Sequence, residues 1–116
     1  MHAYHPPLED FNFILHHFLE IEKEDIKGYN DLLPEFTKTV FEEAGKLAKE
    51  VISPSNKDGD EQGCKLENGV VRTPDSFKLA FEKLREGGWL SLDIEEEFGG
   101  QNLPCLLYTS DAADDP

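Results

Sequence analysis

The 116 residues lack any apolar run that approaches the roughly 18 residues needed to cross a bilayer. The start of the chain, Met1 to Tyr4, also lacks the basic flank and the apolar stretch of a secretory signal peptide. Hydrophobic residues make up 38% of the chain and charged residues 31%, which is typical of a soluble folded protein. We therefore predict one small cytoplasmic domain with a modest core and no membrane partner.

Basic residues are scarce. The chain holds 11 Lys and Arg against 25 Asp and Glu, so its formal net charge is -14. Residues 1–104 still carry a charge of -11, because Asp111, Asp114 and Asp115 are the only charged residues after Pro104. An acidic surface of this kind repels phosphate backbones, which disfavours nucleic acid as a direct partner.

Cysteine is also nearly absent. Cys64 and Cys105 are the two thiols, and in principle they could form a disulfide. If Cys105 is not native, only Cys64 remains. A lone thiol beside a turn, in a chain without a secretory signal, is most often reduced and inert.

Two helices are expected in the N-terminal half, because apolar residues recur there at spacings of three and four. The first covers about residues 11–24, follows Pro6 and Pro7, and can be capped by Asp10. The second covers about residues 34–52 and is stopped by Pro54. The apolar residues expected to be buried are Phe11, Ile14, Leu15, Phe18 and Leu19 on the first helix, and Leu33, Phe36, Val40, Phe41, Ala44, Leu47, Ala48, Val51 and Ile52 on the second.

Residues 53–73 are rich in Gly, Asp and Asn, which predicts a connection between helices. Within it, Asn68 and Gly69 tolerate the positive φ angles of a two-residue hairpin turn. A strand is therefore expected on each side of this pair.

A third helix is expected to begin at Thr73 and Pro74, which are suited to the N-cap and the first helical position. Gly87 and Gly88 end it. Its buried face is expected to consist of Phe77, Ala80, Phe81 and Leu84. The alternation in "WLSLDI" predicts a short extended piece before the acidic turn "EEEFGG".

Acidic residues and histidines raise the question of a metal site. Asp58, Asp60 and Gln62 followed by Gly63 imitate the start of a calcium loop, but no register supplies both the bidentate Glu and the sharp-turn Gly. The histidines are His2, His5, His16 and His17. The last two project about 100° apart on one helix and cannot chelate a single ion. We predict exposed polar residues at these positions and no metal site.

Motifs for catalysis are missing as well. The chain has no nucleophile motif, no Gly-rich phosphate loop after a strand and no dinucleotide fingerprint. The carboxylates of Glu42, Glu43 and residues 95–97 are of the kind that usually lies on a solvated surface. From the residues alone we predict an all-α fold, a small helical bundle with one β-hairpin. We assign no catalytic, cofactor-binding or metal-binding residue.

Residues 4–104 carry three stretches that match one family pattern. They are Tyr4, Pro7, Leu8, Asp10 and Phe13, then "EEAGKLAKEVISPSNKDGDEQGCKLENGVVRTPDSFKLAFEKLREGGW", and then "EEEFGGQNLP". Together they resemble the N-terminal region of the acyl-CoA dehydrogenase family. The segment "GDEQGC" followed by "ENG" and "TP" is similar to the branch that includes methylmercaptopropionyl-CoA dehydrogenase. The chain departs from the family in having Phe98 where Tyr is usual and Ile94-Glu95 where many relatives have Pro.

The resemblance implies that the complete protein is an FAD-dependent flavoenzyme. Members of the family remove the pro-R α-hydrogen of an acyl-CoA as a proton, while the β-hydrogen leaves as a hydride to FAD. They pass electrons to a partner flavoprotein and commonly form homo-oligomers. Their catalytic base is a Glu of a C-terminal helical domain, and their flavin lies between that domain and a middle β-domain. The resemblance therefore implies an incomplete N-terminal helical bundle that serves as scaffold and acyl-pocket wall and is inactive alone.

The last twelve residues, "CLLYTSDAADDP", have neither the apolar spacing nor the cap that a further helix needs. They look like translated adapter text, so residues 105–116 are predicted to be a non-native, disordered tail, and residues 1–104 the incomplete domain. Two alternatives remain. One is a freestanding helical module that docks a protein partner through its Phe-rich faces. The other, disfavoured by the acidic charge, is the relative of this family that associates with alkylated DNA.

Overall fold

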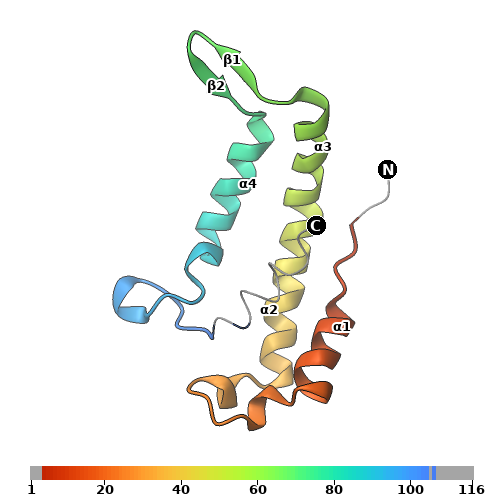
Figure 1. Cartoon of the computed structure of the whole chain (residues 1–116), viewed down its shortest axis with the longest axis vertical. Coiled ribbons are helices and arrows are strands. Elements are labelled where there is room, and N and C mark those ends of the chain that lie inside the picture. The colour runs from red at the N-terminus through yellow and green to blue at the C-terminus, as the bar shows by residue number, and fades with distance from the viewer. Residues whose placement is uncertain (1–3, 105, 107–116) are drawn as a thin grey trace.

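The computed structural model describes residues 4–104 and 106, and within them it shows helices and one two-stranded hairpin (Figure 1). The molecule is elongated, with principal extents of 55 × 37 × 19 Å. A long helical rod forms its axis, α1 lies against one end of the rod, and α4 runs beside the other part. The predicted fold class, all-α with a small β-hairpin, is confirmed.

The rod consists of α2 (Pro34–Leu47), the π-helical segment η4 (Ala48–Ile52) and α3 (Ser53–Gln62). The prediction that Pro54 stops this helix is wrong. Pro54 lies inside the continuous rod, directly after the wider π-helical turn, where the interrupted i to i−4 hydrogen-bond ladder can accommodate a residue that has no N–H. The hydroxyl of Ser55 also donates to the carbonyl oxygen of Ile52 at 2.6 Å. Residues 53–62 are therefore helix rather than a loop.

The N-terminal helix is shorter and begins earlier than predicted. It comprises α1 (Leu8–Asn12) and the π-helical segment η1 (Phe13–Phe18). Asp10 lies inside α1 and does not cap it. The helix cannot continue to Glu24, because Glu20 adopts a left-handed conformation with φ 48°. Two 3-10 turns follow, η2 (Ile21–Lys23) and η3 (Tyr29–Asp31).

The hairpin forms where the sequence predicts it. Strands β1 (Lys65–Glu67) and β2 (Val70–Arg72) pair antiparallel, and the turn residues Asn68 and Gly69 have φ angles of 51° and 77°. Both positive values belong to a type I′ turn, which matches the right-handed twist of the two strands. Both strands are exposed along their whole length. Local turn chemistry therefore specifies the hairpin more than burial does.

Gly69→Ala is expected to destabilise the hairpin by about 1–2 kcal/mol, because an L-residue is strained in the left-handed region. A methyl group at this position would meet no other atom within 4 Å, so the effect isolates backbone strain. Cross-strand nuclear Overhauser contacts between Leu66 and Val71 are expected to weaken. Gly69→Asn is the matched control and should retain them, since Asn tolerates this conformation. Equal contacts in both variants would contradict the prediction.

The third predicted helix is α4 (Asp75–Glu86), and Gly88 ends it with a positive φ of 75°. Thr73 makes no capping bond, and Pro74 is the residue that precedes the first helical turn. The extended piece predicted for "WLSLDI" is wrong, because Trp89–Ser91 forms a 3-10 turn, η5. The acidic turn is present as η6 (Glu96–Phe98), which ends at Gly99 with φ 85°.

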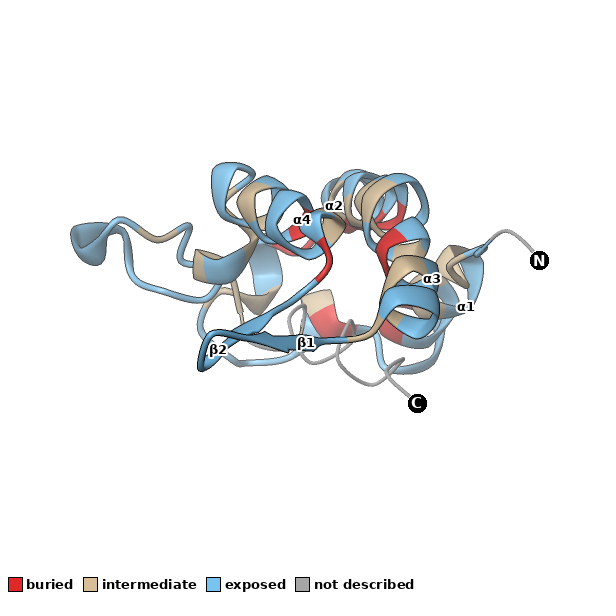
Figure 2. Ribbon diagram, turned by 90° about the horizontal axis from the view of Figure 1, so that it is seen from above, coloured by how far each residue is buried: buried red, intermediate tan, exposed pale blue. Residues whose placement is uncertain are grey.

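The hydrophobic core is small and lies where α1, η1 and η2 meet α2. Its buried members are Leu15, Ile21, Leu32 and Phe41. Figure 2 shows how few segments are buried compared with the exposed surface. Burial was predicted wrongly for Ile14, Phe18, Leu19, Leu33, Phe36, Ile52, Phe77 and Phe81, which are exposed. The periodicity places these side chains on apolar faces, but the described residues leave each of them more than a third exposed.

The domain boundary at residue 104 stays a prediction. Of residues 105–116, only Leu106 belongs to the described part of the chain, and it packs beside the core cluster. The remainder of the predicted tail lies outside the described residues. Within residues 4–104, no helix combines the length and the apolar character that a membrane span requires.

Candidate functional site

An apolar groove runs between the N-terminal segment, the rod and the end of α4. It has a volume of about 160 Å³. Its walls come from the N-terminal segment with Tyr4, Pro6, Leu8 and Phe11, from the α2 and η4 part of the rod, and from residues at and after the end of α4. The side chains that line it include Pro6, Leu8, Val40, Ala44, Leu84 and Trp89.

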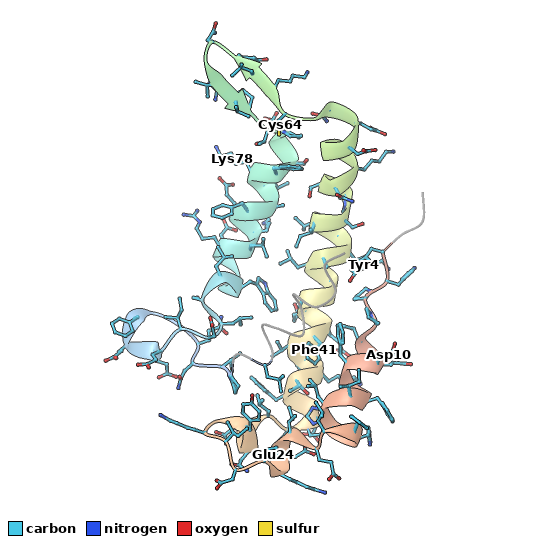
Figure 3. All side chains as sticks on the ribbon, viewed as in Figure 1. Tyr4, Asp10, Glu24, Phe41, Cys64 and Lys78 are labelled. Atoms are coloured by element: carbon cyan, nitrogen blue, oxygen red, sulfur yellow. The ribbon has the colours of Figure 1, made fainter. Side chains whose placement is uncertain are left out.

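Helical periodicity builds one wall of this groove. Val40 lies four residues before Ala44, and Leu47 and Ala48 lie three and four residues after it, so all four share one face of the rod. The small alanine side chains leave a depression between the larger ones. Figure 3 shows Tyr4 beside the middle of the rod and Phe41 close to α1.

Gly45 sets how closely the N-terminal segment approaches the rod. A methyl group on Gly45 would lie 2.8 Å from Cγ of Pro6 and 3.5 Å from the methyl carbons of Leu8. The glycine is buried inside α2, where alanine would be the better helix former by up to about 1 kcal/mol. Close packing against Pro6 is therefore the structural reason for a glycine here.

Gly45→Ala is expected to detach the N-terminal segment, because overpacking costs about 1–3 kcal/mol and exceeds the gain in helix propensity. Amide hydrogen exchange of residues 8–12 should become faster, while exchange within α4 stays unchanged. The matched control is Lys46→Ala, which changes an exposed neighbour on the same helix. Slower exchange of residues 8–12 in Gly45→Ala would show that helix propensity dominates.

The groove suits a short hydrocarbon segment better than a polar ligand. Its lining is mostly apolar, and its volume lies below the roughly 300–1,000 Å³ of pockets that enclose drug-sized ligands. Two more open hollows, of about 480 and 640 Å³, lie beside Lys27 and Phe36 and beside Asn12 and Lys38. Both are more open to solvent than the groove.

A second group of side chains, linked by hydrogen bonds, lies at the core. His16, which was predicted to be exposed, is only 6% exposed. Its Nδ1 lies 3.1 Å from Oε2 of Glu22, and its Nε2 lies 2.6 Å from Oγ1 of Thr37. These three residues come from η1, η2 and α2, so the hydrogen bonds tie three elements together. No local sequence pattern predicts these hydrogen bonds, because the partners lie 6 and 21 residues away.

This chain of hydrogen bonds has the connectivity of a catalytic triad, in which hydroxyl, imidazole and carboxylate follow one another. Thr37 is 0% exposed, however, so a substrate cannot reach its hydroxyl. The same oxygen lies 3.2 Å from the carbonyl oxygen of Pro34. The arrangement therefore connects elements of the fold and does not perform nucleophilic catalysis.

The carboxyl group of Glu22 has a pKa below its usual value of 4.5. The largest cause is a hydrogen bond from its own backbone amide, and the second is the hydrogen bond from His16. Both favour the charged carboxylate. Glu22 is thus held as the anion that faces His16.

Metal ligands are not brought together in the described part of the chain, where no group of three or more His, Cys, Asp or Glu could hold an ion. Asp58, Asp60 and Gln62 lie on α3, where alternate residues project in different directions. His17 is exposed and stacks on the ring of Phe13 at 5.9 Å. His5 is exposed as well, and His2 lies outside the described residues.

No protein-family model matches the chain. Among curated proteins, 3-methylmercaptopropionyl-CoA dehydrogenase of Ruegeria pomeroyi is 32% identical over 106 residues, which cover 90% of this chain. The chain is acyl-CoA dehydrogenase-like. Butyryl-CoA dehydrogenase of Syntrophomonas wolfei is also similar, with 30% identity over 91 residues and 70% of this chain covered. The chain spans only 18% and 14% of the lengths of these two relatives.

The described residues of this acyl-CoA dehydrogenase-like chain do not by themselves fit FAD. The groove is smaller than a pocket for a ligand of that size, and its mostly apolar walls offer no basic side chain for a pyrophosphate. Lys27 and Lys38 line the two more open hollows, and each hollow is also lined by a carboxylate, Asp31 and Glu42 respectively. That catalytic and flavin-binding residues lie elsewhere stays a prediction.

Proposed function

We propose that this chain is part of an FAD-dependent acyl-CoA dehydrogenase that introduces an α,β double bond into an acyl-CoA thioester. In that protein the helices serve as scaffold, and the apolar groove forms part of the wall beside the acyl chain. The proposal includes a cytoplasmic location, a homo-oligomeric complete enzyme and a partner flavoprotein that accepts its electrons. The chain alone is proposed to be inactive.

One observation carries this proposal: the 32% identity to 3-methylmercaptopropionyl-CoA dehydrogenase extends over 90% of the chain. Butyryl-CoA dehydrogenase, which is also similar, is named for a saturated short-chain thioester. The shared feature of the two names is an acyl-CoA substrate, whereas their acyl groups differ. The substrate class is therefore proposed only as an acyl-CoA.

The apolar lining of the groove supports a role as part of the wall beside an acyl chain. Val40, Ala44 and Leu84 present apolar surface to a hydrocarbon chain, and no lysine or arginine lines the groove. Burial of each methylene of a substrate is worth about 0.8 kcal/mol, which favours binding of an acyl chain over a charged group. When bound in the complete enzyme, the flavin supplies hydride acceptance, and the chain described here supplies no group to that step.

The test compares the 116-residue chain with the protein encoded by the complete open reading frame. With butyryl-CoA and an artificial electron acceptor, the complete protein is expected to reduce the acceptor and to carry a flavin absorption spectrum. The chain alone is expected to show neither. Flavin binding and turnover by the chain alone would contradict the scaffold role, and an inert, flavin-free complete protein would contradict the enzyme.

The alternative function is a freestanding helical module that docks a protein partner. The observation that favours it is the set of large apolar side chains that stays exposed, such as Phe13, Phe18 and Leu19 on the N-terminal helix. A stop codon directly after the sequence that encodes residue 104, in independently cloned source DNA, would support this module. A continuing reading frame that encodes a β-domain and a second helical bundle would exclude it.

A further inference from the structure

His16 is buried between three elements and has a hydrogen-bonding partner on each ring nitrogen. The carboxylate of Glu22 faces Nδ1 at 3.1 Å, and the hydroxyl of Thr37 faces Nε2 at 2.6 Å. A carboxylate has no proton to give, so Nδ1 must carry a hydrogen and donate it. The carboxylate therefore selects the neutral tautomer with Nδ1–H and leaves Nε2 as an acceptor.

Thr37 can serve either form of this imidazole. When His16 is neutral, the hydroxyl of Thr37 donates to Nε2. When His16 is charged, Nε2–H donates to Oγ1, and the hydroxyl hydrogen can turn to the carbonyl oxygen of Pro34, which lies 3.2 Å away. No buried donor or acceptor of these side chains loses its partner in either form, which avoids the cost of an unsatisfied polar group.

We propose that His16, Glu22 and Thr37 form a latch that holds the N-terminal helix on the rod in both protonation states of His16 and opens when Glu22 becomes protonated. A protonated Glu22 no longer offers a full negative charge to Nδ1–H. The latch spans η1, η2 and α2 and lies beside the core residues Leu15 and Ile21. Opening it therefore releases the segment that covers one side of that core.

Other charged groups around His16 do not replace Glu22. On the packed elements they are Glu9 and Asp10 on α1, His17 on η1, Glu20 and Lys23 beside Glu22, Asp31 on η3, and Glu35 and Lys38 beside Thr37, all of them exposed. Tyr29 on η3 is half-buried and packs against the core cluster. Lys23 pairs with Glu20 at 2.8 Å rather than with His16.

The direction of the pH effect follows from Glu22. Its hydrogen bonds lower its pKa in the folded chain, so its contribution to stability is fully present above the usual value of 4.5. That contribution is lost as the pH falls below 4.5 and passes the lower folded value. The latch is thus expected to hold at pH 5 to 8 and to open in acid.

The test is nitrogen-15 NMR of the histidine rings in the 116-residue chain, with His17 as the internal control. At pH 8, His16 is expected to show a protonated Nδ1 and an unprotonated Nε2, whereas exposed His17 averages both tautomers. Glu22→Ala should remove this tautomer preference, and Glu22→Gln should weaken it, because its side chain is uncharged like a protonated Glu22. A mixture of tautomers at His16 like that at His17 would overturn the proposal.

Amide exchange of residues 13–18 tests the latch itself. Between pH 8 and 5, the measured exchange rate of the unmodified chain should change only as the intrinsic rate does, so that the protection factor stays constant. Below pH 4.5 the protection factor should fall. Glu22→Gln should show that lower protection already at pH 7 and should lack the acid step, because its side chain is neutral at every pH. Thr37→Val should lower protection roughly tenfold at pH 7, and Thr37→Ser should restore it. No protection at pH 7, or release of the helix already between pH 8 and pH 5, would overturn the proposal.

Discussion

Phe41→Ala is expected to destabilise the packing of the N-terminal half of the molecule strongly. Phe41 is 6% exposed and belongs to the core cluster with Leu15, Ile21 and Leu32. Its ring lies 5.7 Å from that of Phe11, in a tilted arrangement that favours aromatic contact. Truncation of a buried Phe costs about 3–5 kcal/mol, against a total stability of about 5–15 kcal/mol for a typical domain.

Amide hydrogen exchange measures this loss. Protection of α1 and α2 is expected to fall by about two to four orders of magnitude, the range that corresponds to this cost. The cross-strand contacts of the hairpin should persist, since β1 and β2 do not touch Phe41. Phe18→Ala is the matched control, because Phe18 is 74% exposed and its truncation should change protection little. Equal effects of the two substitutions would contradict this view of the core.

Features that depend on neighbouring residues could be predicted from the sequence. Asn68 and Gly69 specify the hairpin turn through their own φ preferences, and Gly88 ends α4 in the same way. The start of the rod at Pro34 could also be predicted from nearby residues, since proline suits a first helical turn. Pro54 misled the prediction because its effect depends on the π-helical turn before it, which has no sequence signature.

Burial could not be predicted in the same way. Periodicity shows which face of a helix is apolar, but whether that face is covered depends on a second layer. On α2 the buried line is Thr37, Phe41 and Gly45, and only Phe41 belongs to the predicted apolar face. Thr37 is buried because it bonds His16, and Gly45 because Pro6 packs on it. Both contacts join residues far apart in the chain.

The family resemblance could be predicted from the sequence, whereas no residue of the candidate groove could. The resemblance, carried by motifs such as "GDEQGC" and "EFGG", agrees with the relatives found by comparison. The groove itself depends on the approach of Tyr4–Leu8 and of Trp89 to the rod, which no local pattern records. Tertiary contacts of this kind require the structure.

The second large effect concerns the cooperativity of the whole chain. Its core cluster lies at one end, where α1 and η2 meet α2, whereas the hairpin end of the molecule buries only small residues such as Ser55 and Ala80. Little shared core couples the two ends, so each can open without the other. We expect a broad, non-cooperative thermal transition of the 116-residue chain, in which the hairpin end loses protection first.

The same chain is expected to bind a dye that fluoresces on apolar surface, already at 25 °C. Large apolar side chains are exposed on several elements, among them Phe13 and Phe18 on η1, Leu66 on β1 and Phe98 on η6, and an extended apolar surface is uncommon on a folded monomer. The double variant Phe18→Ser, Phe98→Ser should reduce dye fluorescence and leave the melting curve unchanged, because neither residue is part of the core. A single sharp transition of a monomer with no dye binding would show instead that the chain buries these faces in solution, and the separation into two weakly coupled ends would then be wrong.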